Sequence, residues 1–474
     1  MIGRKEEKQI LHKAFTSNKP ELVAVIGRRR VGKTYLIRSF FRNKLDFEVI
    51  GLKDNNKKAQ LKNFAFSLKK FGKKDALDTI PTDWLDAFHQ LTEHLESLKE
   101  PQRKKVIFID ELPWMYTPKS DFLTGFGYFW NSYASDNNVL VVICGSATAW
   151  MIKNIINNRG GLHNRVTKKI LLRPFTLSET KEYFLQRNIN FENYQLLLLY
   201  MTMGGIPQYL DQVEGGKSAV QNIDNICFSQ LGSLRTEFDN LYSSLFSKPE
   251  KYEAIVTALS TKWRGLSRPE IVKLTKISDG GGLTTRLKEL EQSGFISSYI
   301  PFNKKKKDTL YRLTDNYSLF YLKFIQNTPP NNDGQWTLIS QTQSWKSWSG
   351  YAFENICLQH ILQIKTALGI SGIHTQQFSF LSKNTDDFPG IQIDLLIDRN
   401  DNTISLCEIK FYNDNFILSK KEAENFRRKK TIFKEITHTK KQIFITLITT
   451  YGLTENVNSI GLIDNIVDMN ALFQ

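Results

Sequence analysis

Short runs of consecutive apolar residues, separated by polar stretches, mark the first part of the chain. They occur at residues 21–27, 104–115 and 139–147, where the sequence reads ELVAVIG, KKVIFIDELPWM and VLVVICGSA. Runs of this kind are typical of strands buried on both faces of a parallel sheet. The first run continues through RRRVGKT into YLIRSFF, whose apolar residues recur with a helical period. The pattern therefore predicts an α/β fold with a strand, a loop and a helix in succession.

Between residues 249 and 325 the pattern changes to amphipathic helices followed by short strands. PEKYEAIVTALS is one helix, and LSRPEIVKLT is a second, with Ser267 as its N-cap and Glu270 three residues later. A glycine turn leads to a third helix with three leucines on one face, namely Leu283, Leu287 and Leu290. SGFISSYIPF and TLYRLTD read as two strands joined by NKKKKD. This order predicts a winged helix-turn-helix.

The last part of the chain predicts a helix and a β-hairpin. WSGYAFENICLQHILQIKTAL has one apolar side, IQIDLLID alternates, and TISLCEIKF returns after the turn RNDN. Upstream, TPPNNDGQW has the composition of a linker. We therefore expect an N-terminal α/β region at 1–240, the winged helix at 249–325, a linker at 326–343 and a final domain at 344–474.

The loop after the first predicted strand has the form G-x-x-x-x-G-K-T. Its glycines let the backbone wrap a phosphate, and the amides at the helix N-terminus point at the anion. Lys33 is expected to reach the β- and γ-phosphates of ATP, and Thr34 to bind Mg²⁺. The three consecutive arginines of the loop are tolerable there because their side chains can point to solvent. The ATP-contacting residues would be Gly27, Arg28, Arg29, Arg30, Val31, Gly32, Lys33 and Thr34. A glycine-rich turn without nucleotide is the alternative.

Polar residues follow the other two predicted strands of this region. Asp110 ends the second strand, where an acid holds Mg²⁺, and Glu111 beside it is the candidate base for the attacking water. Ser146 follows the third strand and is placed to sense the γ-phosphate, although a simple helix cap fits its spacing equally well. The sequence thus predicts ATP and Mg²⁺ as cofactors of the first region.

Five motifs of residues 1–240 occur together in a known group of proteins. GRRRVGKT, IFIDELPWM, ICGSATAWM, LLRPFTLSE and GGIPQYL resemble, in order, those of the prokaryotic AAA/STAND-type ATPases often called archaeal ATPases. The resemblance implies a P-loop parallel sheet and a helical lid that begins near Gly205 and Pro207. It also implies an arginine at the γ-phosphate, for which Arg165 matches by position and Arg159 is a second candidate. Either arginine can instead be an ordinary surface residue.

The predicted winged helix carries a basic hairpin, Lys304 to Lys307. In DNA-binding use, the second helix of the pair enters the major groove and the wing lies beside phosphates. These lysines would then supply salt-dependent affinity that is blind to sequence. The alternative is an internal docking module with a solvated basic hairpin.

The predicted C-terminal hairpin brings acids and a lysine together. A period of two places Asp394 on one face of the first strand, and Glu408 and Lys410 on one face of the second. Two carboxylates can hold Mg²⁺, and a lysine can orient the hydroxide formed on it. The Glu-x-Lys spacing occurs three times in the chain, but only this copy lies on a predicted strand. An ordinary Glu–Lys pair on a strand remains the alternative.

Residues 344–474 resemble the domain of unknown function that is fused to archaeal-type ATPases, which is similar to the PD-(D/E)xK nuclease superfamily. YAFENI, QIDLLID and LCEIKF carry the resemblance. It implies an α/β restriction-endonuclease-like fold with a metal held by Glu354, Asp394 and Glu408, and with Lys410 in catalysis beside Glu408. It does not imply that this copy cleaves DNA, because inactive members of such superfamilies are common.

Composition adds a partner and a location to this picture. The net charge of +16 suits a nucleic-acid partner such as DNA. Residues 340–474 are neutral, with 14 basic and 14 acidic side chains, but residues 420–441 alone carry nine Lys or Arg and three Glu. No apolar run reaches the roughly 18 residues that a membrane span needs, and the charged first residues lack an export signal. The four cysteines lie far apart, so we expect a reducing, cytoplasmic setting.

Two functions from different classes fit the sequence. The first is an ATP-driven enzyme that acts on DNA through a Mg²⁺-dependent phosphodiesterase site. The second is a nucleotide-dependent switch or scaffold whose C-terminal domain is inactive and whose partners are proteins. A homo-oligomer is compatible with both, since the sequence does not fix the oligomeric state.

Overall fold

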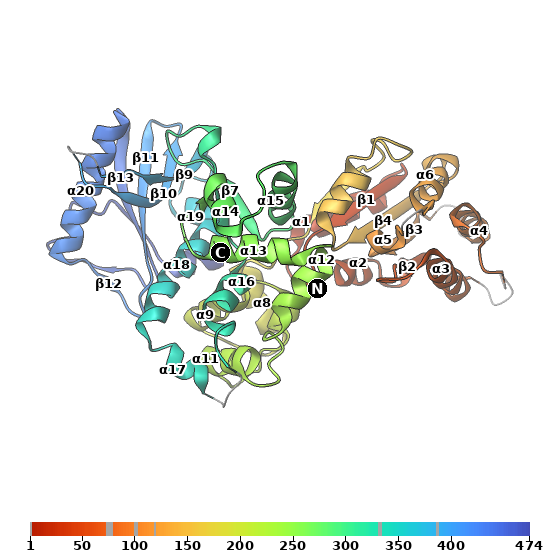
Figure 1. The fold of residues 1–474 in the computed structure, drawn as a ribbon, viewed down its shortest axis with the longest axis horizontal. Coiled ribbons are helices and arrows are strands. Elements are labelled where there is room, and N and C mark those ends of the chain that lie inside the picture. Colours follow the sequence, from red (N-terminus) through yellow and green to blue (C-terminus); the bar gives the residue numbers. More distant parts are fainter. Residues whose placement is uncertain (1, 73–78, 99–102, 118–119, 330–333, 385–387) are drawn as a thin grey trace. The chain divides into compact units, whose positions relative to one another are not determined.

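The computed structural model describes residues 2–474 apart from 73–78, 99–102, 118–119, 330–333 and 385–387. The chain forms two compact units (Figure 1). The first comprises residues 1–174 with 292–294, and the second comprises residues 175–291 with 295–474. Among the described residues, no helix combines the length and the apolar character needed to cross a membrane. We describe the two units separately.

The first unit is built on a five-stranded sheet in the order β2-β3-β4-β1-β5, and all its strand pairs are parallel. The strands are β1 (Glu21–Ile26), β2 (Phe47–Ile50), β3 (Lys105–Asp110), β4 (Val139–Gly145) and β5 (Lys168–Leu171). The helices are α1 (Lys5–Thr16), α2 (Lys33–Phe41), η1 (Arg42–Lys44), α3 (Lys57–Phe71), α4 (Trp84–Glu96), α5 (Leu112–Met115), α6 (Phe122–Ser132), η2 (Ala134–Asp136), α7 (Thr148–Met151) and η3 (Ile152–Ile156). The three strands predicted from apolar runs are β1, β3 and β4, and the α/β prediction is confirmed for this unit.

The apolar strands form the core of this sheet. Every residue of β1 and β4 is buried. One face is covered by an aromatic cluster, in which Trp84 and Phe88 of α4 pack against Phe122 of α6. The parallel pairing places the carboxyl ends of β1, β3 and β4 at one edge of the sheet. That edge is where the phosphate loop begins.

The second unit opens with a group of helices. These are α8 (Leu177–Gln186), α9 (Asn193–Met203), α10 (Pro207–Leu210), α11 (Ala219–Ile223), η4 (Asp224–Phe228) and α12 (Glu237–Leu245). The turn before α10 packs tightly on the chain that leads into α8. The Phe175 amide donates to the Gly205 carbonyl at 2.7 Å, and a Cβ on Gly205 would lie 1.9 Å from the Phe175 carbonyl oxygen. Only glycine fits at this position.

Residues 249–313 contain three helices and a small antiparallel sheet of order β6-β8-β7. The elements are α13 (Pro249–Ser260), β6 (Leu266–Ser267), α14 (Arg268–Thr275), α15 (Gly281–Gln292), β7 (Ile296–Tyr299), η5 (Lys306–Asp308) and β8 (Leu310–Leu313). We call these residues the winged segment, for their element order. The expected helices and both long strands are present, and the short strand β6 was not expected.

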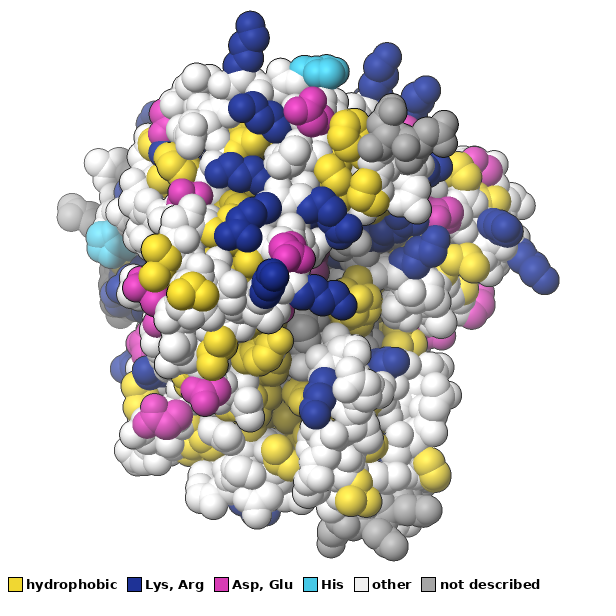
Figure 2. Space-filling model, turned by 90° about the vertical axis from the view of Figure 1, so that its left-hand side faces the viewer, with side chains coloured by type: hydrophobic (Ala, Val, Ile, Leu, Met, Phe, Trp, Pro, Cys, Tyr) yellow, Lys and Arg dark blue, Asp and Glu magenta, His cyan; other side chains and the backbone are white. Residues whose placement is uncertain are grey.

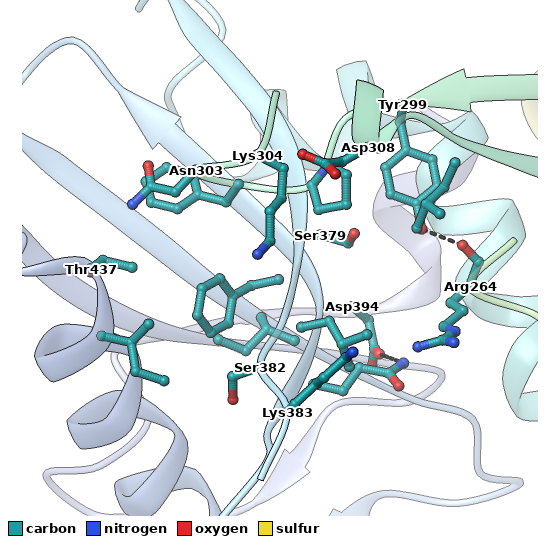
Figure 3. A pocket seen from close by; sticks show the side chains of 18 of the residues that line it. Arg264, Tyr299, Asn303, Lys304, Asp308, Ser379, Ser382, Lys383, Asp394 and Thr437 are labelled. Atoms are coloured by element: carbon teal, nitrogen blue, oxygen red, sulfur yellow. Dashed lines mark hydrogen bonds between the residues drawn. The ribbon is translucent and has the colours of Figure 1, made fainter. Parts of the chain in front are cut away.

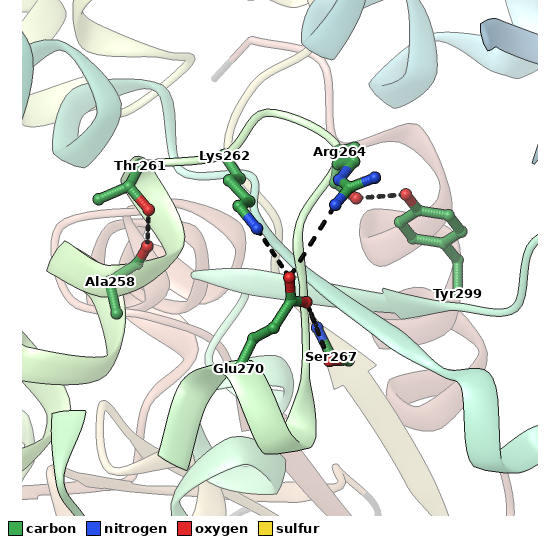
Figure 4. Close-up of polar contacts among 7 residues, drawn as sticks. All are labelled: Ala258, Thr261, Lys262, Arg264, Ser267, Glu270 and Tyr299. Atoms are coloured by element: carbon green, nitrogen blue, oxygen red, sulfur yellow. Dashed lines mark hydrogen bonds and ion pairs between the residues drawn. The ribbon is translucent and has the colours of Figure 1, made fainter. Parts of the chain in front are cut away.

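The predicted capping box at the start of α14 is present and is reinforced by basic side chains (Figure 4). The Glu270 carboxylate accepts hydrogen bonds from the Ser267 amide and hydroxyl and from the Lys262 ammonium at 2.7 Å. Burial raises the pKa of this carboxyl, but these hydrogen bonds and the Lys262 charge outweigh burial and lower the pKa to about 2. Glu270 therefore stays charged and fixes the turn between β6 and α14.

The segment expected to be a linker is only partly irregular. Of residues 326–343, residues 330–333 lie outside the described residues. The others include α17 (Gln335–Ile339), and the chain before them forms α16 (Asn316–Phe320) and η6 (Tyr321–Ile325). Trp336 is 1% exposed and packs against Phe228 and Phe320. A buried tryptophan makes this part of the segment a structural element.

The C-terminal part has a five-stranded mixed sheet of order β15-β13-β11-β10-β9. Its strands are β9 (Thr375–Leu381), β10 (Gln392–Arg399), β11 (Thr403–Lys410), β13 (Gln442–Thr449) and β15 (Asn465–Val467); β12 (Phe416–Ile417) and β14 (Leu453–Thr454) pair separately. The helices are α18 (Gln343–Gln359), α19 (Ile361–Ala367), α20 (Lys420–Thr437) and η7 (Met469–Phe473). The hairpin of β10 and β11 is present as expected. The single helix expected after residue 346 is instead two helices that meet at His360.

Helix α18 connects separate parts of the second unit, two of them through side-chain hydrogen bonds. Asn355 donates to the Thr314 carbonyl at 3.0 Å and to Asn316 Oδ1 at 2.8 Å, just after β8. His360, at the end of α18, accepts from the Leu177 amide at the start of α8 and hydrogen-bonds the Ile356 carbonyl through Nδ1. Helix α18 thus joins the opening helices to the chain just after β8, and its Phe353 also packs against Phe411 just after β11.

We predict that Gly205→Ala destabilises the second unit by about 2 kcal/mol or more, because the added methyl group overlaps the backbone at Phe175. Gly350→Ala is the matched control, since nothing lies within 4 Å of a Cβ at that helical position. The control should be neutral or more stable by about 0.5–1 kcal/mol. Urea unfolding followed by circular dichroism measures both. Equal stability of the two variants would contradict the packing described at Gly205.

We also predict a pH-dependent stability from His360. Burial lowers the pKa of its imidazole, and the hydrogen bond to the Ile356 carbonyl opposes this only in part. The folded state therefore binds fewer protons than the unfolded state, so stability is full above the ordinary pKa and falls as the pH drops below it. Urea unfolding near pH 7.5 and pH 5.5 should show a larger loss in the parent than in His360→Gln, whose amide oxygen can accept from Leu177. Equal losses would contradict this role.

Candidate functional site

The phosphate loop lies between β1 and α2. The Lys33 ammonium donates to the carbonyls of Gly27 and Arg28, at 3.0 Å each, and the side chain is 6% exposed. Gly27 and Gly32 have φ values of 153° and 90°, and a Cβ on Gly27 would lie 2.3 Å from the Leu172 carbonyl oxygen. The two glycines are therefore required by the path of the loop, as the motif predicts.

The arginines of the loop do not all point to solvent. Arg28 is only 4% exposed, while Arg29 and Arg30 are half-buried. Arg28 therefore does not use the solvent-facing position that is open to the loop arginines, because it is buried just after β1. Val31 is also buried, and its carbonyl accepts a hydrogen bond from Arg4 of the first residues. The loop is consequently packed from both sides.

Asp110, the last residue of β3, contacts the second residue of α2. Its carboxylate accepts from the Thr34 hydroxyl at 2.7 Å and from the Glu111 amide at 2.9 Å, and the Cys144 thiol of β4 also donates to it. Burial raises the pKa of the Cys144 thiol, and the Asp110 charge raises it further, so the thiol keeps its proton. A hydroxyl and a carboxylate in contact at the edge of the sheet offer the hard oxygen ligands that Mg²⁺ prefers. The residues present thus fit a magnesium ion.

Glu111 and Ser146 are held together across the same edge. The Glu111 carboxylate accepts from the Ser146 amide at 3.0 Å and from its hydroxyl at 2.9 Å. Glu111 has a left-handed backbone with φ of 45°, which turns the chain from β3 into α5. The candidate base and the candidate γ-phosphate sensor therefore contact each other, which the sequence did not reveal.

The structure does not bring Arg165 to the phosphate loop of its own chain. Arg165 is exposed and precedes β5, which runs parallel to β1 with Lys168 beside Val23. Val23 is four residues before Gly27, so at about 3.3 Å per residue the start of β5 lies some 13 Å from the loop along the strand. Arg159 is also exposed. Arg165 thus lies toward the opposite edge of the sheet from the candidate nucleotide site.

In the C-terminal sheet, the strand register brings two of the predicted acids face to face. Leu395 pairs with Cys407 and Leu396 with Leu406, so the same antiparallel register continued by one residue sets Asp394 opposite Glu408. Opposed residues on an antiparallel pair share a face, with Cβ atoms about 5 Å apart. Lys410 lies two residues further along the same face of β11.

Glu354 of α18 joins this pair. The pKa of its carboxyl is raised to about 8, first by burial and then by the charges of Asp394 and Glu408, against an opposing effect of Arg312. The Arg312 guanidinium of β8 lies 3.7 Å from the Glu354 carboxylate. Asp394 of β10 and Glu408 of β11 are therefore close enough to Glu354 of α18 to raise the pKa of its carboxyl.

Glu408 is held by a lysine that the sequence analysis did not assign to the site. The Lys429 ammonium of α20 donates to Glu408 Oε1 at 2.6 Å, and Glu408 is 2% exposed. Burial raises the pKa of the Glu408 carboxyl, while Lys429 and Lys410 lower it. Within the described residues, no group of three or more His, Cys, Asp or Glu side chains is arranged to hold a metal ion. The charges of these acids therefore influence Glu354, but the Glu408 carboxylate is already hydrogen-bonded to Lys429.

A cavity of about 860 Å³ opens beside these acids, within the second unit (Figure 3). Glu354 and Asp394 line it, together with residues of the winged segment, β9 and the end of α20. Asp394 accepts a hydrogen bond from Gln392 at 3.0 Å. Two of the three acids can therefore be reached by a ligand of the size of a nucleotide.

Basic side chains collect on the surface of the C-terminal part. Figure 2 shows Lys and Arg side chains gathered over much of the face that includes α20. The exposed basic residues of this helix are Lys420, Lys421, Arg427, Arg428 and Lys434. The lysines of the hairpin loop, Lys304 to Lys307, are exposed as well.

Comparison with known proteins identifies the first part of the chain. Residues 1–213 match the family model described as an ATPase domain predominantly from Archaea. The uncharacterized protein MJECL04 of Methanocaldococcus jannaschii is 24% identical over 419 residues, which are 86% of this chain and 87% of that protein. The uncharacterized ATP-binding protein MJ0423 of the same organism is 49% identical over 43 residues, or 9% of this chain and 73% of that protein.

Solved structures also align with the chain. The Walker-type ATPase PABY2304 of Pyrococcus abyssi covers 68% of this chain and 96% of its own, with 18% identity and a TM-score of 0.49. The ORC2 protein of Aeropyrum pernix, solved in ADPNP and ADP complexes, covers 68% and 93%, with 14% identity and a TM-score of 0.41. Residues 1–213, which contain the parallel sheet and its phosphate loop, thus match ATPase domains found predominantly in Archaea.

Proposed function

We propose that this protein binds and hydrolyses ATP in its first unit and acts on DNA through a metal-dependent phosphodiesterase site in its C-terminal domain. The observation that carries the second half is the meeting of Glu354, Asp394 and Glu408, where burial and then the charges of Asp394 and Glu408 raise the pKa of Glu354 to about 8. Carboxyl groups whose pKa is shifted by burial and by neighbouring charges are typical of functional sites. A divalent cation would relieve the repulsion among them.

In the ATPase half, Lys33 leaves the loop carbonyls to bind the β- and γ-phosphates. Thr34 and Asp110 would hold Mg²⁺, which neutralises the charge of the phosphates. Glu111 orients and deprotonates the attacking water, and Ser146 reports the γ-phosphate through its contact with Glu111. Each role uses an atom that already lies at the carboxyl edge of the sheet.

Arg165 serves a neighbouring copy of the chain in this proposal. Its position near the start of β5 puts it out of reach of its own phosphate loop, whereas a second subunit can present a nucleotide to it. A stabilising arginine supplied by another chain is a known device in phosphoryl transfer. The active ATPase is then a homo-oligomer.

In the C-terminal half, Glu354, Asp394 and Glu408 would hold a divalent cation that activates a water molecule for attack on a phosphodiester. Glu408 must exchange its contact with Lys429 for the cation. Lys410 and Lys429 would then be available to orient the attacking water and to stabilise the charge on the phosphate. The winged segment and the exposed basic residues of α20 would hold the DNA backbone.

A second function is favoured by the contact between Lys429 and Glu408. If that contact is permanent, the acids never bind a metal and the C-terminal domain only docks. The protein would then be a nucleotide-dependent switch with protein partners. The two functions differ in whether the carboxylates are needed for an activity on DNA.

We predict that Lys33→Ala abolishes ATP binding, because the phosphates lose their cation, whereas the exposed-site control Lys62→Ala binds normally.

Arg165→Ala should bind ATP but lose hydrolysis by about 10³-fold or more. A mixture of the Lys33→Ala and Arg165→Ala chains should recover part of the activity if the arginine acts on a neighbour. Phosphate release assays measure all four samples. Normal ATP hydrolysis by Lys33→Ala would contradict the assignment of the phosphate loop as the ATP site.

We predict that the protein cleaves DNA with Mg²⁺ or Mn²⁺, and that the rate rises as the pH approaches 8, where Glu354 loses its proton. Glu408→Gln and Lys410→Ala should each reduce cleavage by at least about 10²-fold, because the cation and the hydroxide lose their partners. The exposed-site control Glu455→Gln should cleave like the parent. Gel analysis of labelled DNA, with and without ATP, gives the rates. Undiminished cleavage by Lys410→Ala would place the activity elsewhere.

A further inference from the structure

The cavity beside Glu354 and Asp394 has two kinds of wall. Part of the wall is apolar and includes Phe302 of the winged segment and Phe380 of β9. The Phe302 ring is fixed by contacts with Phe378 and Phe433, and its amide donates to the Ser379 carbonyl at 2.9 Å. The volume of about 860 Å³ falls within the roughly 300–1,000 Å³ of ligand sites. Aromatic rings therefore form a rigid platform inside the cavity.

The other kind of wall is basic. Lys304 of the hairpin loop and Lys383 after β9 both line the cavity. Figure 3 shows their side chains reaching into it from two different elements. Neither ammonium pairs with an acid in the described part of the chain, whereas Arg312 already lies 3.7 Å from Glu354. Lys304 and Lys383 thus place two ammonium groups in the cavity, and neither is paired with a carboxylate among the described residues.

We propose that this cavity binds an unpaired nucleic-acid strand, with phosphates on Lys304 and Lys383 and a base against Phe302 and Phe380. The inference rests on the proposed function and deepens it, because a strand bound in this way would place a phosphodiester beside Glu354 and Asp394, which line the same cavity. The substrate class is then single-stranded ends, flaps or flipped-out nucleotides. Lys304 and Lys383 are binding residues that select it.

The chemistry of the walls favours an unpaired strand over a duplex. Sites for single strands combine a basic groove with aromatic side chains on which bases stack, and both features are present here. A base exposes its face for such stacking only when it has left the duplex stack. Duplex readers instead place a helix in the major groove and leave the bases paired. Helix α15, the candidate for that role, contributes no residue to the described walls of the cavity.

The test measures binding in EDTA, so that no cleavage takes place. A dye-labelled oligothymidylate of about six nucleotides, within the usual site size, is titrated with the full chain while fluorescence anisotropy is followed. The double variant Lys304→Ala/Lys383→Ala should bind about tenfold more weakly, and its salt slope should fall by about 1.4, or about 0.7 for each phosphate that is no longer neutralised. The double variant Lys58→Ala/Lys62→Ala, on exposed positions of α3 in the first unit, removes the same charge outside this cavity and should bind like the parent.

Three results would overturn the inference. They are no binding by the parent, equal weakening of both double variants, and equal competition by a blunt hairpin duplex. Thermal unfolding of both variants identifies any that fail to fold, and Phe302→Leu then tests the aromatic platform without a change of charge. Glu408→Gln separates this inference from the proposed function, because it should bind the strand in EDTA whether or not the parent cleaves DNA.

Discussion

Hydrogen bonds along one helix hold the second unit together. Helix α18 contacts the opening helices through His360 and the chain just after β8 through Asn355. Buried polar groups of this kind stabilise only when every partner is in place. Glu354 sits one residue before Asn355, so the same contacts that fix the helix also fix an acid of the candidate site.

The candidate site in the C-terminal sheet is a balance of charges. Three carboxylates that approach one another in a largely buried place raise their own pKa values unless cations compensate. Here Lys429, Lys410 and Arg312 compensate in part, and Glu354 keeps a pKa of about 8. A divalent cation would compensate more fully than the lysines, because it contacts several oxygens at once. In the proposed function, Glu408 exchanges its contact with Lys429 for the cation.

Local rules made much of this architecture predictable. The glycine spacing gave the phosphate loop, the Ser267–Glu270 capping box gave the start of α14, and the period of two placed Asp394 and Glu408 on one face. What could not be predicted depends on packing between distant segments. Lys429 reaches Glu408 from another element, and Trp336 is buried by aromatic rings about 16 and 108 residues earlier in the chain. No local pattern of residues encodes such contacts.

The central claim is that the C-terminal acids form a divalent-metal site. Crystals of the protein soaked in Mn²⁺ test it most directly, because anomalous scattering locates manganese without assumptions about its ligands. The account predicts a manganese ion bound by Glu354, Asp394 and Glu408, at distances near 2.2 Å that are typical of hard cations with oxygen ligands, with Lys429 moved off Glu408. Manganese absent from these acids, with Glu408 still bound to Lys429, would contradict the account.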